Sequence, residues 1–209
     1  MIQIDMNNKE EVKALTLFHR RCKTIGINGL TQETFVKYIK TISKPCVFEF
    51  YYKQPREKIF IGKRILVGDI RSNPFVKKDF KPNDLIELGK KKGFHYRKYE
   101  YLGNPFYKRH LKEKNPESAK REYQAYVLGN PNAQTQFKEL FAELERHQIV
   151  FLMCYCPVKK PRNRHDPGEC HRFWLSELLE KQKRVELNKI REINSKIGVH
   201  ETKIEVLKI

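Results

Sequence analysis

The chain has 209 residues, of which 39% are hydrophobic and 11% aromatic, a composition that excludes a wholly disordered protein. No apolar run approaches the roughly 20 residues of a membrane-spanning helix, and the N-terminus lacks the apolar core of a signal peptide. We therefore expect one cytoplasmic domain over 1–209 with no membrane partner. The 43 Lys and Arg against 25 Asp and Glu give a net charge of +18, which favours a polyanionic partner, most simply nucleic acid, and DNA over RNA.

The first half of the chain predicts alternating helices and strands. Apolar residues at helical spacing predict a helix over 32–42, and the aromatic and β-branched run over 46–52 predicts a strand. The short apolar run over 65–70 is typical of a strand that is buried on both faces. A helix over 81–92 follows, and Gly93 is expected to end it.

The second half continues the alternation. A strand is expected over 94–103, two helices over 115–129 and 132–148, and a buried strand over 149–156. A long C-terminal helix is expected from about residue 171. This order predicts an α/β fold, specifically a Rossmann-like three-layer domain around a mainly parallel sheet. Functional groups of such folds gather where the strands end at their carboxyl edge.

Four stretches occur in an order that resembles a known family. They are KTIGINGLTQETFVKYIK (23–40), LVGDIRSNPF (66–75), LIELGKKKGFHYRKYEYLGN (85–104), and FLMCYC followed by CHRFWLSELL (151–179). Their Thr-Ile-Gly, Asp-x-Arg and Cys-His-Arg motifs are similar to those of the uncharacterised family called domain of unknown function 488. The resemblance implies an α/β fold and a shared site, and it implies no particular activity.

The chain departs from that pattern in two basic segments. A basic insertion at about 46–64 is long enough for a hairpin, and Cys156 with the basic segment 157–169 lengthens the approach to Cys-His-Arg. Both segments add positive charge near the expected site. A variable C-terminal tail is expected at about 198–209.

Asp69 and Arg71 form the first candidate site. At positions i and i+2 of a strand their side chains share a face. A carboxylate and a guanidinium at the end of a strand could orient a water molecule and clamp a phosphate or a carbonyl. The alternative is a structural ion pair that fixes the following loop.

Cys170, His171 and Arg172 form the second candidate site, at the expected start of the long helix. A helix N-terminus favours an anion and activates a thiol. A reactive thiolate, a phosphate held at the helix terminus and a structural hydrogen-bond cluster all fit this motif. Because adjacent side chains on a helix diverge, the sequence argues against His171 as the base of Cys170. We therefore favour an anion site, with Arg172 as its clamp.

The cysteines raise the question of a metal. No cofactor is favoured, and zinc is the alternative, held by Cys154, Cys156, Cys170 and His165 or His171. The single residue between Cys154 and Cys156 is tighter than the spacing of structural zinc sites. Buried, inert thiols would fit equally well.

Aromatic and basic residues alternate over 94–110. A second group of basic residues lies in 157–169, just before the Cys-His-Arg motif. Aromatic faces can stack exposed bases while cations hold the phosphate backbone. The candidate nucleic-acid-binding residues are His95, Arg97, Tyr99, Tyr101, Lys108, Arg109, Lys159, Lys160 and Arg162.

These features together predict an enzyme that processes nucleic acid, most simply a DNA hydrolase of the glycosylase or nuclease kind, as used in DNA repair. Its catalytic residues would be Asp69, Arg71 and the Cys-His-Arg group. Two alternatives remain open. The first is a nucleic-acid-binding module without chemistry, and the second is sulfur or phosphoryl transfer through Cys170 or Cys154. The sequence also leaves a homodimer open.

Overall fold

The computed structural model describes most of the chain. The described residues are 13–15, 18, 21–42, 46–50, 57–61, 64–72, 78–113, 115–146, 149–157 and 170–196.

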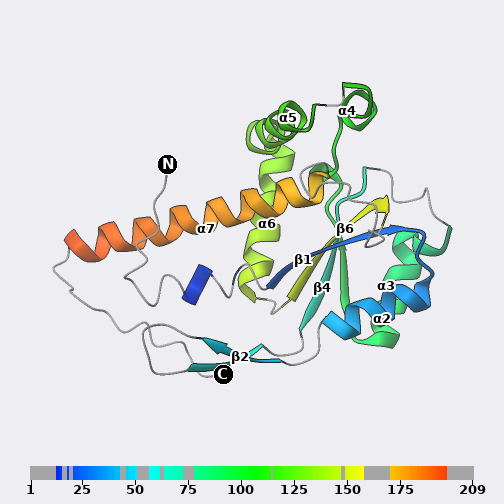
Figure 1. Cartoon of the computed structure of the whole chain (residues 1–209), viewed down its shortest axis with the longest axis horizontal. Coiled ribbons are helices and arrows are strands. Elements are labelled where there is room, and N and C mark those ends of the chain that lie inside the picture. The colour runs from blue at the N-terminus through cyan, green and yellow to red at the C-terminus, as the bar shows by residue number, and fades with distance from the viewer. Residues whose placement is uncertain are drawn as a thin grey trace.

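A four-stranded parallel sheet forms the centre of the molecule (Figure 1). Its strands are β1 (Cys22–Asn28), β6 (Ile149–Pro157), β4 (Ile65–Asp69) and β5 (His95–Lys98), in that spatial order. Every pairing in this sheet is parallel, as the alternation of helices and strands predicts.

The two central strands, β6 and β4, are apolar because both faces of the sheet are covered. Along β6, Val150 and Leu152 face one helical layer, whereas Phe151 and Met153 face the other. All five residues of β4 are buried, including its last residue, Asp69. A carboxylate at the end of a wholly buried strand must find its partners inside the protein.

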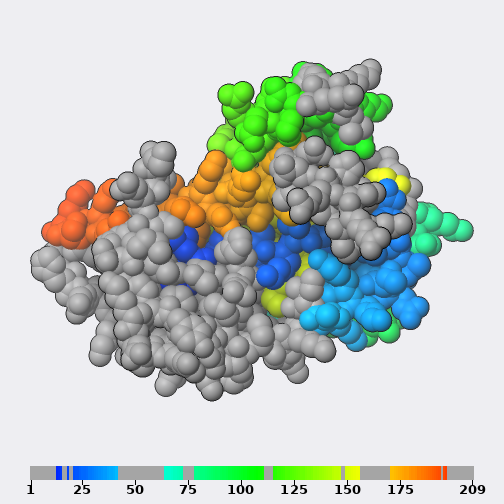
Figure 2. All heavy atoms as spheres, viewed as in Figure 1, coloured from blue at the N-terminus to red at the C-terminus, as the bar shows by residue number. Residues whose placement is uncertain are grey.

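Helices cover both faces of the sheet and complete three layers, which confirms the predicted architecture. One face carries α2 (Gln32–Ile42) and α3 (Pro82–Lys92). The other carries α5 (Pro116–Gly129), α6 (Pro131–Arg146) and the long α7 (His171–Lys196). In Figure 2 the residues of α7 (orange) lie against those of α5 (green).

The capping residues explain where the helices begin and end. Pro82 takes the first turn of α3, where its missing N–H costs nothing, and Gly93 ends the helix with a φ of 80°. The side chain of Asn115 accepts a hydrogen bond from the backbone N–H of Ser118 and so caps α5.

The predicted basic insertion contains a two-stranded antiparallel sheet. Its strands are β2 (Cys46–Phe50) and β3 (Glu57–Ile61). None of the described helices combines the length and the hydrophobicity that crossing a bilayer requires.

The strand predicted over 94–103 is shorter than the sequence suggests. It ends at Lys98. The backbone N–H of Tyr99 still donates to the oxygen of Asp69, and the chain then turns into the 3-10 helix η2 (Glu100–Leu102). A short helix that the sequence did not predict, α4 (Tyr107–Glu113), follows this turn. A second 3-10 helix, η1 (Lys78–Phe80), precedes α3.

Candidate functional site

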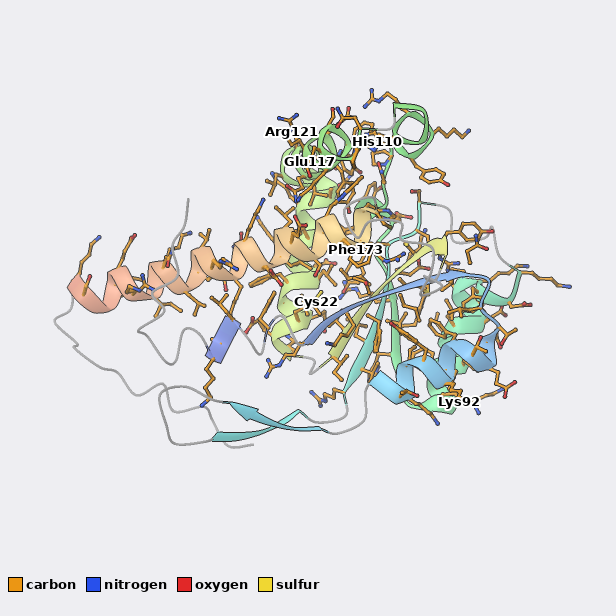
Figure 3. All side chains as sticks on the ribbon, viewed as in Figure 1. Cys22, Lys92, His110, Glu117, Arg121 and Phe173 are labelled. Atoms are coloured by element: carbon orange, nitrogen blue, oxygen red, sulfur yellow. The ribbon has the colours of Figure 1, made fainter. Side chains whose placement is uncertain are left out.

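The carboxyl ends of β4 and β6 meet the first turn of α7. Just beyond β4, the backbone N–H of Ile70 donates to the oxygen of Met153 in β6 at 3.0 Å. Figure 3 labels Phe173 in the first turn of α7, and Cys170, His171 and Arg172 directly precede it. The structure therefore brings the Asp-x-Arg and Cys-His-Arg motifs to one edge of the sheet, as predicted for the carboxyl ends of parallel strands.

Asp69 and Arg71 form a buried, bidentate ion pair. The Nε and Nη2 atoms of Arg71 donate to the two carboxylate oxygens at 2.8 and 2.6 Å, and its backbone N–H donates to Oδ1 at 3.1 Å. The hydroxyl of Tyr96 donates to Oδ2 at 2.7 Å. The side chains of Asp69 and Arg71 are 0% and 1% exposed, so the carboxylate is shielded from solvent and accepts its hydrogen bonds from protein groups.

The prediction that Asp69 acts on a substrate and that Arg71 clamps one stays a prediction, and both side chains are buried and paired with each other. The guanidinium of Arg71 also donates to the carbonyl oxygen of Phe80 at 2.7 Å, which ties the end of β4 to η1. Tyr96 completes the cluster, and its pKa is raised by burial and by the negative charge of Asp69. These contacts are the ones that the alternative, a loop-fixing ion pair, requires.

The residue between Asp69 and Arg71 links this pair to the Cys-His-Arg motif. The carbonyl oxygen of Ile70 lies 3.1 Å from Nε2 of His171. Because a carbonyl oxygen can only accept a hydrogen bond, Nε2 must carry the proton. In the neutral ring Nδ1 is then an acceptor.

The thiol of Cys170 is placed to donate its proton to Nδ1 of His171. Its Sγ lies 3.9 Å from Nδ1 of His171. Cys170 precedes α7, and its carbonyl oxygen accepts from the N–H groups of Phe173 and Trp174, as an N-cap residue does. The argument that adjacent helical side chains diverge is therefore wrong here, because Cys170 lies outside the helix.

The imidazole of His171 is held neutral. It packs edge-to-face against the ring of Tyr123, with the ring centroids 5.6 Å apart. Burial lowers the pKa of His171 below its ordinary value of 6.5, and Arg172 lowers it further, whereas Cys154 and the Ile70 carbonyl raise it. A neutral His171 with a free acceptor at Nδ1 has the chemistry of a general base.

A second thiol completes the site. Sγ of Cys154, near the end of β6, lies 3.5 Å from Sγ of Cys170. The Nη1 atom of Arg172 donates to Sγ of Cys154 at 2.8 Å, and its guanidinium stacks on the ring of Phe173, 4.7 Å from the centroid. Arg172 is 5% exposed and its cation faces a sulfur, so its role as an anion clamp stays a prediction.

The family model named domain of unknown function DUF488 matches residues 60–179 of the 209-residue chain. This chain belongs to the DUF488 family. The match contains both the Asp-x-Arg and the Cys-His-Arg motif, whereas the Thr-Ile-Gly motif precedes it. Neither the curated proteins nor the solved structures contain a significant match to the chain.

A polar chain that the sequence did not predict lies beside the DUF488 motifs. Nδ2 of Asn104 donates to Nδ1 of His110 at 3.1 Å, and Nε2 of His110 then donates to Glu122 at 2.8 Å. Ser72, which follows Arg71, donates to the carbonyl oxygen of Asn104 at 3.2 Å. The Leu-Gly-Asn-Pro turn marks the position of Asn104 in the sequence. Nothing in its spacing identifies His110 or Glu122 as members of the same hydrogen-bonded chain.

The zinc prediction remains untested. Within the described side chains, no group of three or more His, Cys, Asp or Glu residues is arranged to hold a metal ion. Cys154 and Cys170 are close together. The side chain of Cys156 and all of His165 lie outside the described residues.

The predicted nucleic-acid surface of this DUF488 protein is only partly open. Tyr99 is 0% exposed and packs over Gly68, so it cannot stack a base, and this prediction is wrong. Tyr101 is 40% exposed on η2. Arg97 is paired with two glutamates of α6, and Arg109 with a glutamate of α5.

Three of the remaining candidates for this surface lie outside the described residues. His95 and Lys108 are exposed, as the prediction requires. The three that the structure does not describe are Lys159, Lys160 and Arg162.

Proposed function

We propose that this protein is a thiol-dependent enzyme that acts on nucleic acid and prefers DNA to RNA. Cys170 is its nucleophile and His171 is its base. The observation that carries the proposal is the geometry of His171. Its Nε2–H is fixed by the carbonyl oxygen of Ile70, so Nδ1 is left to accept a proton from the thiol of Cys170.

The buried ion pair supports this assignment through the backbone. Asp69 and Arg71 flank Ile70, and their hydrogen bonds fix the direction of the Ile70 carbonyl. We therefore assign Asp69 and Arg71 as positioning residues that act through His171. The two family motifs then work as one unit: the middle residue of Asp-x-Arg orients the histidine of Cys-His-Arg.

The reaction class follows from the groups that are available. The carboxylate of Asp69 is enclosed by donors, so hydrolysis with this residue as the base loses its support. A thiolate at the N-terminus of a 26-residue helix suits transfer of a phosphoryl or sulfur group, because the helix dipole stabilises negative charge on the sulfur and on the group it attacks.

Nucleic acid is proposed as the substrate because of the net charge of +18. The same charge supports a second candidate, a nucleic-acid-binding module without chemistry. Exposed cations such as Lys108 would serve that module equally well. The two candidates differ in whether they need Cys170.

The test begins with binding of labelled single- and double-stranded DNA and RNA. Several phosphate contacts should weaken binding by on the order of 10³-fold between about 50 and about 200 mM salt. The preferred nucleic acid is then incubated with wild-type protein, with a Cys170→Ser variant and with a Cys22→Ser variant as the matched control, because Cys22 lies in β1, away from α7's first turn.

The expected result is turnover by the wild type and by Cys22→Ser. Cys170→Ser should bind as tightly as the wild type and turn over roughly 10³-fold more slowly or not at all. Full activity of Cys170→Ser would exclude the nucleophile, and binding without turnover by every protein would favour the binding module.

A further inference from the structure

We infer that Cys154 and Cys170 form a reversible disulfide and that a hydroperoxide is the oxidant this site accepts. The inference goes beyond the proposed function, because it needs neither nucleic acid nor turnover. It rests on two sulfur atoms 3.5 Å apart, one beside a ring nitrogen that can take its proton and the other beside a guanidinium.

The geometry requires only a small movement to make the bond. A disulfide has its sulfur atoms about 2.05 Å apart, so the two sulfurs must approach by roughly 1.5 Å. Cys154 is 0% exposed and anchored in the central strand β6, whereas Cys170 is partly exposed and precedes α7. The movement therefore belongs to Cys170, which is the sulfur an oxidant can reach.

The two sulfurs have different partners, and these suggest different roles. His171 can take the proton of Cys170 and so prepare it as the attacking thiolate. Arg172 donates to Cys154 at 2.8 Å, which stabilises negative charge on the second sulfur. Cys170 is thus the sulfur that is oxidised first, and Cys154 is the one that resolves it.

The chemistry balances in two steps. The Cys170 thiolate attacks one oxygen of the hydroperoxide, so an S–O bond forms, the O–O bond breaks, and the leaving oxygen takes the proton from His171. Cys170 is now a sulfenic acid. The sulfur of Cys154 then attacks that of Cys170, an S–S bond forms, the S–O bond breaks, and hydroxide leaves with the proton of Cys154 as water. Two electrons pass from the two thiols to the peroxide.

The alternative is that both thiols are inert and that Arg172 only satisfies its hydrogen-bonding capacity on Cys154. Free cysteine is commonly a small buried hydrophobic residue. Cys22 represents that case within the same chain. It is buried, accepts a hydrogen bond from Ser176 at 3.4 Å, and has its pKa raised by burial to about 11. It is therefore the internal control.

The experiment treats the reduced full-length protein with an equimolar amount of hydrogen peroxide, blocks the remaining thiols and maps the linked peptides by mass spectrometry. The expected product joins Cys154 to Cys170 and is reversed by dithiothreitol. Cys170 should be oxidised roughly tenfold or more faster than Cys22. Absence of this link, or links that join either cysteine to Cys46 or Cys156 instead, would overturn the inference.

Variants separate the two steps. Cys154→Ser should leave Cys170 as a sulfenic acid that dimedone traps, and His171→Asn should slow oxidation while giving the same disulfide. Should Cys154→Ser fail to fold, the wild type still gives the answer, because a trivalent arsenical bridges only two thiols that lie close together. Arsenical bridging of another pair would contradict the inference.

This experiment also separates the inference from the proposed function. The reduced wild type has both thiols available and is assayed before and after treatment with peroxide. Turnover of nucleic acid by the reduced wild type, together with formation of the Cys154–Cys170 link after peroxide, would support both proposals. A disulfide in a wild type that turns over no nucleic acid would support the disulfide and refute the proposed function.

Discussion

At the scale of single residues, the Asp69–Arg71 pair shows what sequence spacing can and cannot tell. The i, i+2 spacing correctly predicts that the two side chains meet. It cannot tell that the hydroxyl of Tyr96 and the carbonyl of Phe80 surround them. Tyr96 lies 27 residues from Asp69 in the sequence and Phe80 lies 9 residues from Arg71, so the spacing of the pair gives no sign of either contact.

Asp69→Asn should destabilise the protein. It leaves the buried guanidinium of Arg71 without a counter-charge, and breaking such a pair costs about 3–5 kcal/mol. The measurement is the free energy of unfolding in denaturant, with Asp84→Asn as the control, because Asp84 is exposed in the first turn of α3. The control should change stability by less than about 1 kcal/mol. Equal effects of the two substitutions would refute the buried pair.

His171 gives a prediction for stability in acid. Its pKa in the folded protein lies below the ordinary value of 6.5, chiefly because of burial. The stability from this group is therefore complete above pH 6.5 and is lost as the pH falls below it, since the unfolded chain binds the proton first. Thermal unfolding from pH 7.5 down to about 5 should show a smaller loss for His171→Asn than for the wild type. Parallel losses would contradict the neutral ring.

At the scale of the elements, the long and strongly patterned segments are predictable. The buried strands β4 and β6 and the long α7 follow from apolar runs and helical spacing. The end of β5 does not, because the alternation of aromatic and charged residues continues past Lys98. At this point the chain turns into η2, and the ring of Tyr99 packs over Gly68, 3.4 Å from the position of an added Cβ.

The start of α7 at His171 agrees with the predicted start at about residue 171, and the position of Cys170 just before it decides the chemistry. With Cys170 inside the helix, its side chain would diverge from His171. As the residue before the helix, it brings its sulfur within 3.9 Å of the ring. Sequence patterns locate helix ends less accurately than this.

The turn between α3 and β5 offers a prediction at the same scale. A Cβ on Gly89 would overlap the carbonyl oxygen of Phe94 and lie 3.2 Å from its ring. Gly89→Ala should therefore lower the free energy of unfolding by about 1–3 kcal/mol. Gly129→Ala, at the open end of α5, should be neutral or stabilising by up to about 1 kcal/mol. A tolerated Gly89→Ala would show that the turn can relax.

At the scale of the whole molecule, the net charge suggests a class of partner and the family match identifies a family of unknown function. Neither identifies an activity. The net charge of +18 predicts a polyanionic partner, but the predicted arginines Arg97 and Arg109 are engaged by glutamates. The family match spans the two motifs that meet at the sheet edge. Composition is enough to predict a class of partner. It cannot predict the pairing of Cys170 with His171, because that pairing depends on the contact of His171 with the carbonyl oxygen of Ile70, which is distant in the sequence.

The most direct test of the central claim is the pH dependence of alkylation at Cys170, resolved by mass spectrometry for each of the five cysteines. In the wild type Cys170 should react faster than Cys22 near neutral pH. His171→Asn should slow Cys170 there and match the wild type at alkaline pH, where hydroxide ionises the thiol. Identical rates and pH profiles in the two proteins would show that His171 does not activate Cys170, and the proposed site would fail.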